Sequence, residues 1–585
     1  MATATGVEDD LDRLGGQPRV PGGSRRQPLR AIADLGRRGQ SFGQRGWKKL
    51  DSASLSALAV TERVRGPQPD PVPYVEGETG IARPLAMSGI IGFVGSALVL
   101  WGASQPTSPF TLTRSTWAWL AGQPPAGVSP WYFGTGPIVG HPNVFYGVVA
   151  VYAGMILMVR GFFGVMRLTR QHPGLPVRCL APVFIAWILP LLVVAPLFSH
   201  DAYSYVGQGE QMSRHINPYV YGPQVLGVGG NPYASFVDRL WENTTSPYGP
   251  VFLWLAGGIV SVVNHNELAA LVGFRILALF GVVLLAVFIP RLARSYGRDA
   301  ASAFALIALN PIVLLHLVAG EHNDALMMGL LVAGLALARE RHPIVGIVLC
   351  TLAALVKVPA LIGVIYIGWD WCGDGVARGQ RLRTTAKAVA ISGAVMAIIT
   401  EAVGLGWGWV SALSNPDSVR SWLDPATALG LGAAKLVNAI GLGDHWHILL
   451  SVARGGAFLL AAVIGLRLLL RADGGAGSLL ALGLTMLAVV LLGPVVQPWY
   501  LVWGLVLLAP IAGTRMRMLV VVLSVVCSFL GLPGARTLLG EIGRANPLVI
   551  AFAAAVIAVV IVIPLVPRLR RLLIDQTLQD VAPDP

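Results

Sequence analysis

The sequence predicts an all-α polytopic membrane protein. Of its 585 residues, 54% are hydrophobic and only 12% are charged, and the mean hydropathy is +0.65. This composition excludes an ordinary soluble enzyme. A membrane helix needs about 20 mostly apolar residues, and counting such stretches gives about twelve to fourteen spans. Their predicted starts lie near residues 87, 142, 180, 266, 301, 324, 343, 358, 386, 447, 477, 498, 516 and 546.

The two ends of the chain differ from this apolar middle. Residues 1–85 lack an apolar core and carry scattered acids, glycines and prolines, so we expect a disordered cytoplasmic tail rather than a signal peptide. The membrane domain is predicted over 86–570, followed by a second cytoplasmic tail at 571–585. The net charge of +13 is spread over the ends of spans, so it does not indicate a nucleic-acid partner.

The basic residues predict the orientation. With the N-terminus placed inside, the inner connections carry 19 Lys and Arg residues and the outer ones carry 8. Cytoplasmic loops carry such an excess, so we expect a multi-pass protein of the plasma (inner) membrane with both termini in the cytoplasm. The basic inner connections are 167–178, 291–298, 339–341, 378–387, 467–471, 515–517 and 568–571.

The orientation depends on two apolar stretches that do not cross the membrane. Tyr248–Val263 is sixteen residues long and begins among prolines, which is short for a span. We expect it, and likewise Ala426–Leu442, to lie on the outer face as juxtamembrane helices. Two long external loops then result, at 199–265 and 404–446.

A polar cluster follows the apolar segment that ends at Phe198. It contains His200, Asp201, Tyr203 and Tyr205. A carboxylate at a low-dielectric boundary has raised basicity and can act as a general base toward a hydroxyl. We therefore predict a catalytic site around Asp201, with a simple helix cap as the alternative.

A second cluster, Glu321-His322-Asn323-Asp324, follows another apolar segment. It is predicted to face the same side as Asp201. Its acids and histidine could position an acceptor hydroxyl, bind a divalent ion or lock the turn.

Two isolated cations, Arg275 and Lys357, lie within apolar sequence. Each could bind a phosphate, or could extend its side chain to the membrane interface.

The remaining candidate binding residues lie in the outer turns. They are polar or aromatic side chains that could contact a lipid-borne substrate, although aromatic residues also anchor membrane proteins at the interface. They are Arg214, His215, Tyr248, Gln497 and Trp499.

The external loop resembles that of the GT-C glycosyltransferases, polytopic enzymes that use polyprenyl-phosphate sugars. The resemblance rests on Asp201-x-Tyr203, on His215–Tyr219 and on Ser246–Trp254. Within that superfamily the chain is most similar to the actinobacterial polyprenol-phosphate-mannose-dependent α-1,6-mannosyltransferases of the MptA/MptB type, and more to MptB. Asp201 is followed by Ala202 where such enzymes often carry a second acid. We expect neither a metal ion nor another cofactor.

The resemblance implies an inverting transfer of mannose from polyprenyl-phosphate-mannose. The acceptor would be a mannosylated phosphatidylinositol or lipomannan, extended through α-1,6 linkages into the lipomannan and lipoarabinomannan backbone on the outer face. Asp201 would be the base, and Glu321 and Asp324 would orient the acceptor. The leaving phosphate would be held by Arg275 and Lys357, with Arg214 as a further candidate.

Other classes of protein remain as alternatives. A related transferase could use another lipid-linked sugar, such as arabinose. A transporter of lipid or sugar would place ionisable residues near the bilayer midplane, often in two matching halves. The acids here follow the ends of apolar segments, and the sequence contains no convincing internal repeat.

Overall fold

A computed structural model describes most of the predicted membrane domain. It covers residues 80–105, 108, 110–111, 142–227, 237–238, 241–373, 375–411, 424–532 and 536–537. The predicted tails, apart from residues 80–85, and the predicted span near 546 lie outside the described residues. Within them the secondary structure is helical, except for the two-residue antiparallel pair Gly531–Leu532 and Arg536–Thr537.

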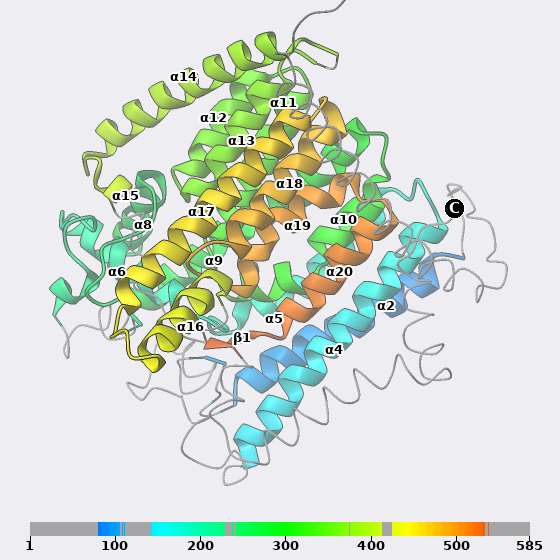
Figure 1. The fold of residues 1–585 in the computed structure, drawn as a ribbon. Helices are drawn as coiled ribbons and strands as arrows, with labels where there is room; N and C mark the ends of the chain where they lie inside the picture. Colours follow the sequence, from blue (N-terminus) through cyan, green and yellow to red (C-terminus); the bar gives the residue numbers. More distant parts are fainter. Residues whose placement is uncertain are drawn as a thin grey trace, which may run out of the picture. The chain divides into compact units, whose positions relative to one another are not determined.

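The helices of Figure 1 are part of one compact unit formed by residues 71–585. Short 3₁₀ turns join several of them. The longer helices are α2 (Ala82–Ala103), α4 (Pro142–Gln171), α5 (Ala181–Val193), α6 (Asp201–Ser213), α8 (Pro250–Val262), α9 (Glu267–Ser295), α10 (Ala300–Ala308), α11 (Asp324–Arg339), α12 (Pro343–Ala354), α13 (Leu361–Asp370), α14 (Arg378–Val403), α16 (Pro425–Ala439), α17 (Trp446–Arg471), α18 (Gly475–Leu491), α19 (Val502–Leu508) and α20 (Thr514–Ser528).

The predicted starts agree with the structure better than the predicted number of spans does. A helix or 3₁₀ turn begins close to each predicted start from 87 to 516 except the one near 386, where α14 already begins at Arg378. Only five described helices are long and apolar enough to cross a membrane, or six if one bent pair counts as a span. The difference arises because prolines and polar turns divide other apolar stretches into helices of 10–17 residues. The two predicted juxtamembrane stretches form the short helices α8 and α16.

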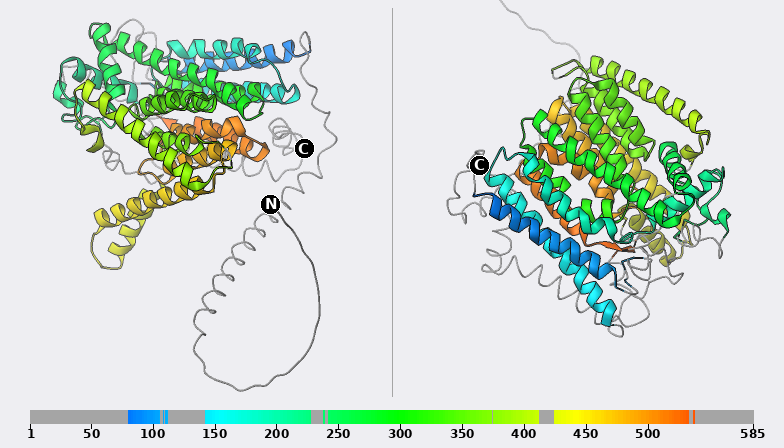
Figure 2. Two further views of the ribbon diagram at one scale, coloured as in Figure 1. Left: turned by 90° about the horizontal axis from the view of Figure 1, so that it is seen from above. Right: turned by 180° about the vertical axis from the view of Figure 1, so that it is seen from behind.

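Two long helices near the N-terminal end of the described chain, α2 and α4, lie side by side in Figures 1 and 2. Their glycines allow the backbones to approach closely. A Cβ atom on Gly95 would lie 2.6 Å from the carbonyl oxygen of Gly154, and one on Gly102 would lie 2.5 Å from that of Gly147. Small residues commonly permit such packing between membrane helices.

The bent pair lies at the centre of the fold and leads to the second polar cluster. Helix α10 and the π-helix Val313–Ala319 meet at 56°. Pro311 lies at the break, where it cannot donate a main-chain hydrogen bond. The side chain of Asn310 binds the main chain on both sides of the break: its Nδ2 donates to the carbonyl of Leu306 at 3.0 Å, and its Oδ1 accepts from the N–H of Ile312 at 3.2 Å. The bend directs the chain into the turn at Gly320–Asn323.

Helices α9 and α11 cross where Gly281 allows the closest approach. A Cβ atom at Gly281 would lie 2.3 Å from the carbonyl carbon of Ala325 and 2.4 Å from the N of Leu326. Both atoms belong to the main chain and cannot rotate away. Because Ala325 follows Asp324, this crossing also fixes the position of the second polar cluster.

A Gly281→Ala substitution is therefore expected to force α9 and α11 apart. Overpacking of this kind costs about 1–3 kcal/mol, so thermal unfolding of the purified protein in detergent should occur at a lower temperature. Gly393→Ala in α14 is the matched control, because no atom lies within 4 Å of its added Cβ. An equal melting temperature for both variants would contradict the close crossing.

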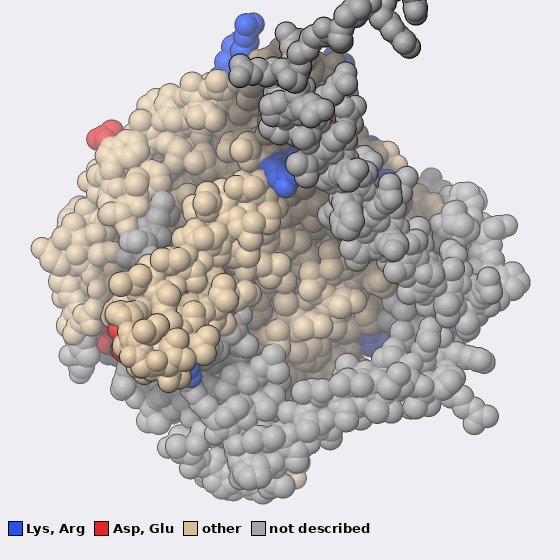
Figure 3. Space-filling view, viewed as in Figure 1, with Lys and Arg blue, Asp and Glu red and all other residues tan. Residues whose placement is uncertain are grey.

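The helices on the face shown in Figure 3 present few charged side chains. Helix α17 contributes many of the apolar ones: Ile448, Val452, Phe458, Leu459 and Leu466 are each more than half exposed. Such a surface is stable against lipid rather than water. The protein is therefore an all-α polytopic membrane protein, as the sequence predicts.

Candidate active site

Asp201 begins helix α6, directly after the main chain leaves the apolar segment of α5. The hydroxyl of Ser199 accepts a hydrogen bond from the N–H of Asp201 at 3.0 Å. An acidic side chain in the first helical turn is also stabilised by the helix dipole. The carboxylate is 21% exposed, so it is ordered by its surroundings yet reachable by a ligand.

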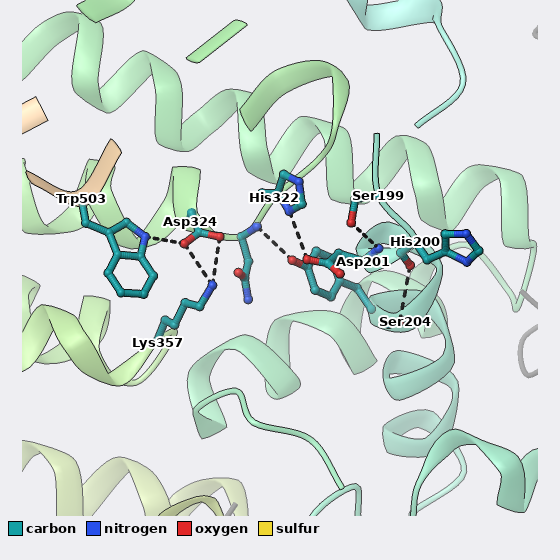
Figure 4. Close-up of polar contacts among 10 residues, drawn as sticks. Ser199, His200, Asp201, Ser204, His322, Asp324, Lys357 and Trp503 are labelled. Carbon is teal, nitrogen blue, oxygen red and sulfur yellow. Dashed lines mark hydrogen bonds and ion pairs between the residues drawn. The ribbon is translucent and has the colours of Figure 1, made fainter. Parts of the chain in front are cut away.

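The structure brings the two polar clusters together, as the sequence predicts. Nδ1 of His322 lies 3.2 Å from Oδ2 of Asp201 (Figure 4). The N–H of Leu197 donates to the carbonyl of Ala319 at 3.0 Å, which joins the two turns. Phe198 and Glu321 adopt left-handed backbone conformations, with φ of 65° and 57°. Such strain at non-glycine residues persists only where surrounding contacts hold it.

The ring of His322 is fully buried and stacks on Trp499, with centroids 4.0 Å apart. Trp499 lies in the 3₁₀ turn Pro498–Leu501. The N–H of Val496, just before this turn, donates to the carboxylate of Asp424 at 2.7 Å. The histidine is therefore held from one side by an indole and oriented toward Asp201 on another.

The surroundings keep Asp201 ionised. Burial raises its pKa, but the hydrogen bond and charge of His322, with the charge of Lys357 and the hydrogen bond to Ser199, outweigh burial and hold the pKa below its ordinary value. The carboxylate is thus available to accept a proton at neutral pH.

Replacing His322 by Gln should raise the pKa of Asp201, because a group that lowers it is removed. Asp201 would then become protonated at a higher pH, and the acid limb of the pH–rate profile should move to higher pH. At neutral pH we expect a loss of about 10- to 100-fold from the missing charge-assisted hydrogen bond. His445→Gln, at an exposed turn, is the control. An unchanged acid limb in His322→Gln would show that His322 does not control the base.

A second charged group lies beside this pair. Nζ of Lys357 is 3.0 Å from both carboxylate oxygens of Asp324, and Nε1 of Trp503 donates to Oδ1 of Asp324 at 2.6 Å (Figure 4). Tyr500 faces the ammonium at 4.2 Å from its ring centroid. Burial lowers the pKa of Lys357, but the charge of Asp324 outweighs it and the pKa is raised. The lysine therefore stays charged.

Arg275 and Glu321 form an ion pair that is hidden from ligands. Nη2 of Arg275 lies 2.6 Å from Oε1 of Glu321, and the two side chains are 3% and 0% exposed. The guanidinium also donates to the carbonyls of Leu192, at 2.9 Å, and Val194. The roles predicted for Arg275, as a phosphate ligand, and for Glu321, as a contact for the acceptor, stay predictions; the structure pairs the two side chains with each other and leaves little of either exposed.

Three tyrosines of segment 199–265 lie in or beside the site: Tyr203 and Tyr205 are buried, and Tyr248 is partly buried. The hydroxyl of Tyr205 accepts from the N–H of Asn323 at 3.3 Å, and its ring meets that of Tyr248 edge-on with centroids 5.3 Å apart. Burial and the charge of Glu321 raise the pKa of Tyr203 well above its ordinary value. Tyr203 therefore remains protonated, and it packs in the buried wall of the site rather than acting as a base.

Other predicted residues lie farther from Asp201 or point elsewhere. Arg214 and His215 follow the C-terminal end of α6, about 20 Å along the helix from Asp201. Arg214 is paired with Glu210 at 2.6 Å. The ring of His200 points away from His322 in Figure 4. Gln497 is buried just before Trp499.

Several buried polar atoms beside Asp201 have no hydrogen-bond partner among the described residues. They are Nε2 of His322, both polar atoms of the Asn323 amide, and Nε1 of Trp499. A buried polar atom left unpaired costs about 1–3 kcal/mol, so their concentration at one place indicates where a polar ligand or ordered water completes the site. No group of three potential metal ligands converges within the described chain.

The sequence did not reveal Asn323 and Trp503 as site residues. Asn323 lies inside the second cluster but carries no charge, and Trp503 lies within an apolar helix where tryptophan commonly serves packing. The spacing of four residues between Trp499 and Trp503 was the available signal, because it places both near one face of a turn.

The apolar helical bundle places a partly exposed carboxylate beside a buried histidine, an arrangement suited to acid–base chemistry in a membrane protein. Comparison with known families makes the class specific. The family model described as alpha-(1→6)-mannopyranosyltransferase, N-terminal domain, matches residues 89–373, and that of the MptB C-terminal domain matches 426–564. The chain belongs to this family of alpha-(1→6)-mannopyranosyltransferases and is a mannosyltransferase.

Individual relatives agree with this assignment. A probable alpha-(1→6)-mannopyranosyltransferase of Mycolicibacterium smegmatis is 34% identical over 62% of this chain and 69% of its own length. An alpha-(1→6)-mannopyranosyltransferase of Mycobacterium tuberculosis is 34% identical over 55% of this chain and 64% of its own. Alpha-(1→6)-mannopyranosyltransferase A of the same organism is 36% identical over 57% of this chain and 65% of its own length. The chain thus spans less than two thirds of both M. tuberculosis proteins. No solved structure matches.

Proposed function

We propose that the protein is an inverting GT-C mannosyltransferase that moves mannose from polyprenyl-phosphate-mannose to a membrane glycolipid. The acceptor is a mannosylated phosphatidylinositol or lipomannan, and the product is an α-1,6-linked mannose of the lipomannan and lipoarabinomannan backbone. The acceptor 6-hydroxyl attacks the anomeric carbon of a β-linked donor. As the new bond forms, the bond from the anomeric carbon to phosphate oxygen breaks, polyprenyl phosphate leaves and Asp201 takes the hydroxyl proton.

The observation that carries this proposal is the Asp201–His322 pair beside unpaired buried polar atoms. A general base must lie within reach of the proton that it removes, and Asp201 is the exposed member of the pair. The adjacent amide of Asn323 and Nε1 of Trp499 supply hydrogen-bonding capacity for sugar hydroxyls. Carbohydrate acceptors present such hydroxyls in number.

The geometry favours Lys357 over Arg275 as the contact for the donor phosphate. Lys357 is 13% exposed, whereas Arg275 is 3% exposed. The ammonium ion is partly neutralised by Asp324, and its remaining positive field would stabilise a leaving phosphate without a metal ion. Asp324 then positions Lys357 instead of contacting the acceptor directly.

The distribution of basic residues supports an outward-facing site. We place the enzyme in the plasma membrane with both termini in the cytoplasm, so that Asp201 faces the exterior. A donor and an acceptor that are both anchored in lipid would reach the site from the bilayer surface.

The proposal is tested with radiolabelled polyprenyl-phosphate-mannose and a mannosyl-phosphoinositide acceptor, using the purified protein in liposomes. Transfer to the acceptor, with the new linkage identified as α-1,6, is the expected result. Transfer of arabinose but not mannose would indicate the related transferase. Movement of intact lipid or sugar across the bilayer without transfer would indicate a transporter.

A further inference from the structure

A cavity with basic and apolar walls lies at the opposite end of α11 from Asp324. It has a volume of about 330 Å³ and is lined by Arg339 and Arg341. Because α11 extends from Asp324 to Arg339, the cavity is about 22 Å from the active site along the helix. None of the residues around Asp201 lines it, so the proposed transfer reaction does not account for it.

The charge of this cavity is positive. Arg339 and Arg341 flank Glu340, but both carboxylate oxygens of Glu340 are bound by Arg291, at 3.0 and 2.5 Å. Arg341 is exposed, and its guanidinium takes part in none of the ion pairs found among the described residues. The acid within the cavity is Asp370, which lies 3.7 Å from Arg339. Two arginines therefore face one carboxylate.

Neutral groups make the cavity suitable for an oxyanion. Ser478 lines it and is 4% exposed, and its hydroxyl has no partner within the described structure. The cavity also lies at the N-terminal ends of α12 and α18, since Pro343 and Ser478 both contribute to its wall. Helix N-termini favour anions because their N–H groups and dipoles point toward the ligand.

The other walls suit a lipid. Tyr296 and Trp371 contribute aromatic rings, and Leu335, Leu479 and Leu482 contribute apolar surface. The guanidinium of Arg339 lies 5.0 Å from the centroid of Tyr296. Basic pockets between membrane helices bind the headgroups of anionic lipids, and the apolar walls here could contact the adjoining acyl chains.

We propose that this cavity binds the phosphate headgroup of an anionic phospholipid. Arg341 and Ser478 contact the phosphate oxygens, Arg339 contributes charge, and the leucines contact the first part of the acyl chains. The site is separate from the one that takes donor and acceptor. Its existence does not depend on which lipid-linked sugar the enzyme uses.

The test measures binding of short-chain phosphatidylglycerol to the delipidated full-length protein in detergent by native mass spectrometry. Dihexanoyl-phosphatidylcholine and inorganic phosphate are the comparison ligands. Loss of one charge-assisted contact in Arg341→Gln should weaken phosphatidylglycerol binding at least about tenfold. Arg341→Lys should retain most of the affinity. Arg383→Gln, at an exposed position of α14 outside the cavity, should match the wild type.

A second variant protects the test against an effect on folding. Ser478→Ala removes one neutral contact and should weaken binding by a factor of about 2–10. Each variant is compared only if its melting temperature without lipid matches that of Arg383→Gln. Equal affinity of wild type and Arg341→Gln, or no binding of phosphatidylglycerol, would overturn the site. Inorganic phosphate binding as tightly as phosphatidylglycerol would show that a soluble phosphate is the ligand and would overturn the lipid assignment.

Discussion

Asp201→Asn is expected to lower the turnover of mannose transfer by about 10²- to 10⁴-fold, the range contributed by a general base. The amide keeps the shape of the side chain but cannot accept the proton of the attacking hydroxyl. Initial rates with radiolabelled polyprenyl-phosphate-mannose, normalised to the amount of folded protein, measure this loss.

The fold should tolerate this substitution. Asp201 is 21% exposed, and the hydrogen bond that anchors its main chain uses the hydroxyl of Ser199 rather than the carboxylate. The melting temperature should therefore change little. Asp444→Asn, an exposed carboxylate before α17, is the matched control and should retain full activity. Equal transfer by Asp201→Asn and Asp444→Asn would remove Asp201 from the mechanism.

The local part of this architecture could be predicted from the sequence. Apolar stretches and their flanking prolines predict most of the observed helix starts. They can do so because the length of an apolar run and the position of a helix break depend on residues that are close in sequence. The expectation that the two polar clusters lie together agrees with the structure, in which the side chains of Asp201 and His322 are 3.2 Å apart. Both follow the ends of apolar segments, and the charge bias predicts the same side of the membrane for both.

The partners of the buried charges could not be predicted in the same way. The bond from Trp503 to Asp324 joins residues 179 positions apart, and it depends on how α11 and α19 cross. An isolated charge in apolar sequence, such as Arg275, predicts a partner but does not identify it. The partner is Glu321, and only the packing of α9 against the turn before α11 reveals it.

Breaking that ion pair is expected to have the largest effect on stability. Glu321→Gln leaves the guanidinium of Arg275 buried without a counter-charge, and removing one member of a buried pair typically costs about 3–5 kcal/mol. Arg275→Met should cost at least as much, because the carbonyls of Leu192 and Val194 also lose a donor. Thermal unfolding in detergent, with retained activity measured after heating, reports both losses.

The double variant Arg275→Met/Glu321→Gln distinguishes a coupled pair from two independent residues. Because neither charge remains, its loss should be smaller than the sum of the single losses by about 0.5–3 kcal/mol. Losses that simply add would mean that the pair is not coupled.

A matched control lies at the other ends of the same two helices. Arg291 binds Glu340 with distances of 3.0 and 2.5 Å, but these side chains are 37% and 33% exposed. Water solvates such a pair, so Glu340→Gln should change stability by no more than about 1 kcal/mol. If Glu340→Gln destabilises the protein as much as Glu321→Gln does, burial does not explain the importance of the Arg275–Glu321 pair. A large loss in Glu321→Gln alone would show that this hidden pair holds the turn from which His322 reaches Asp201.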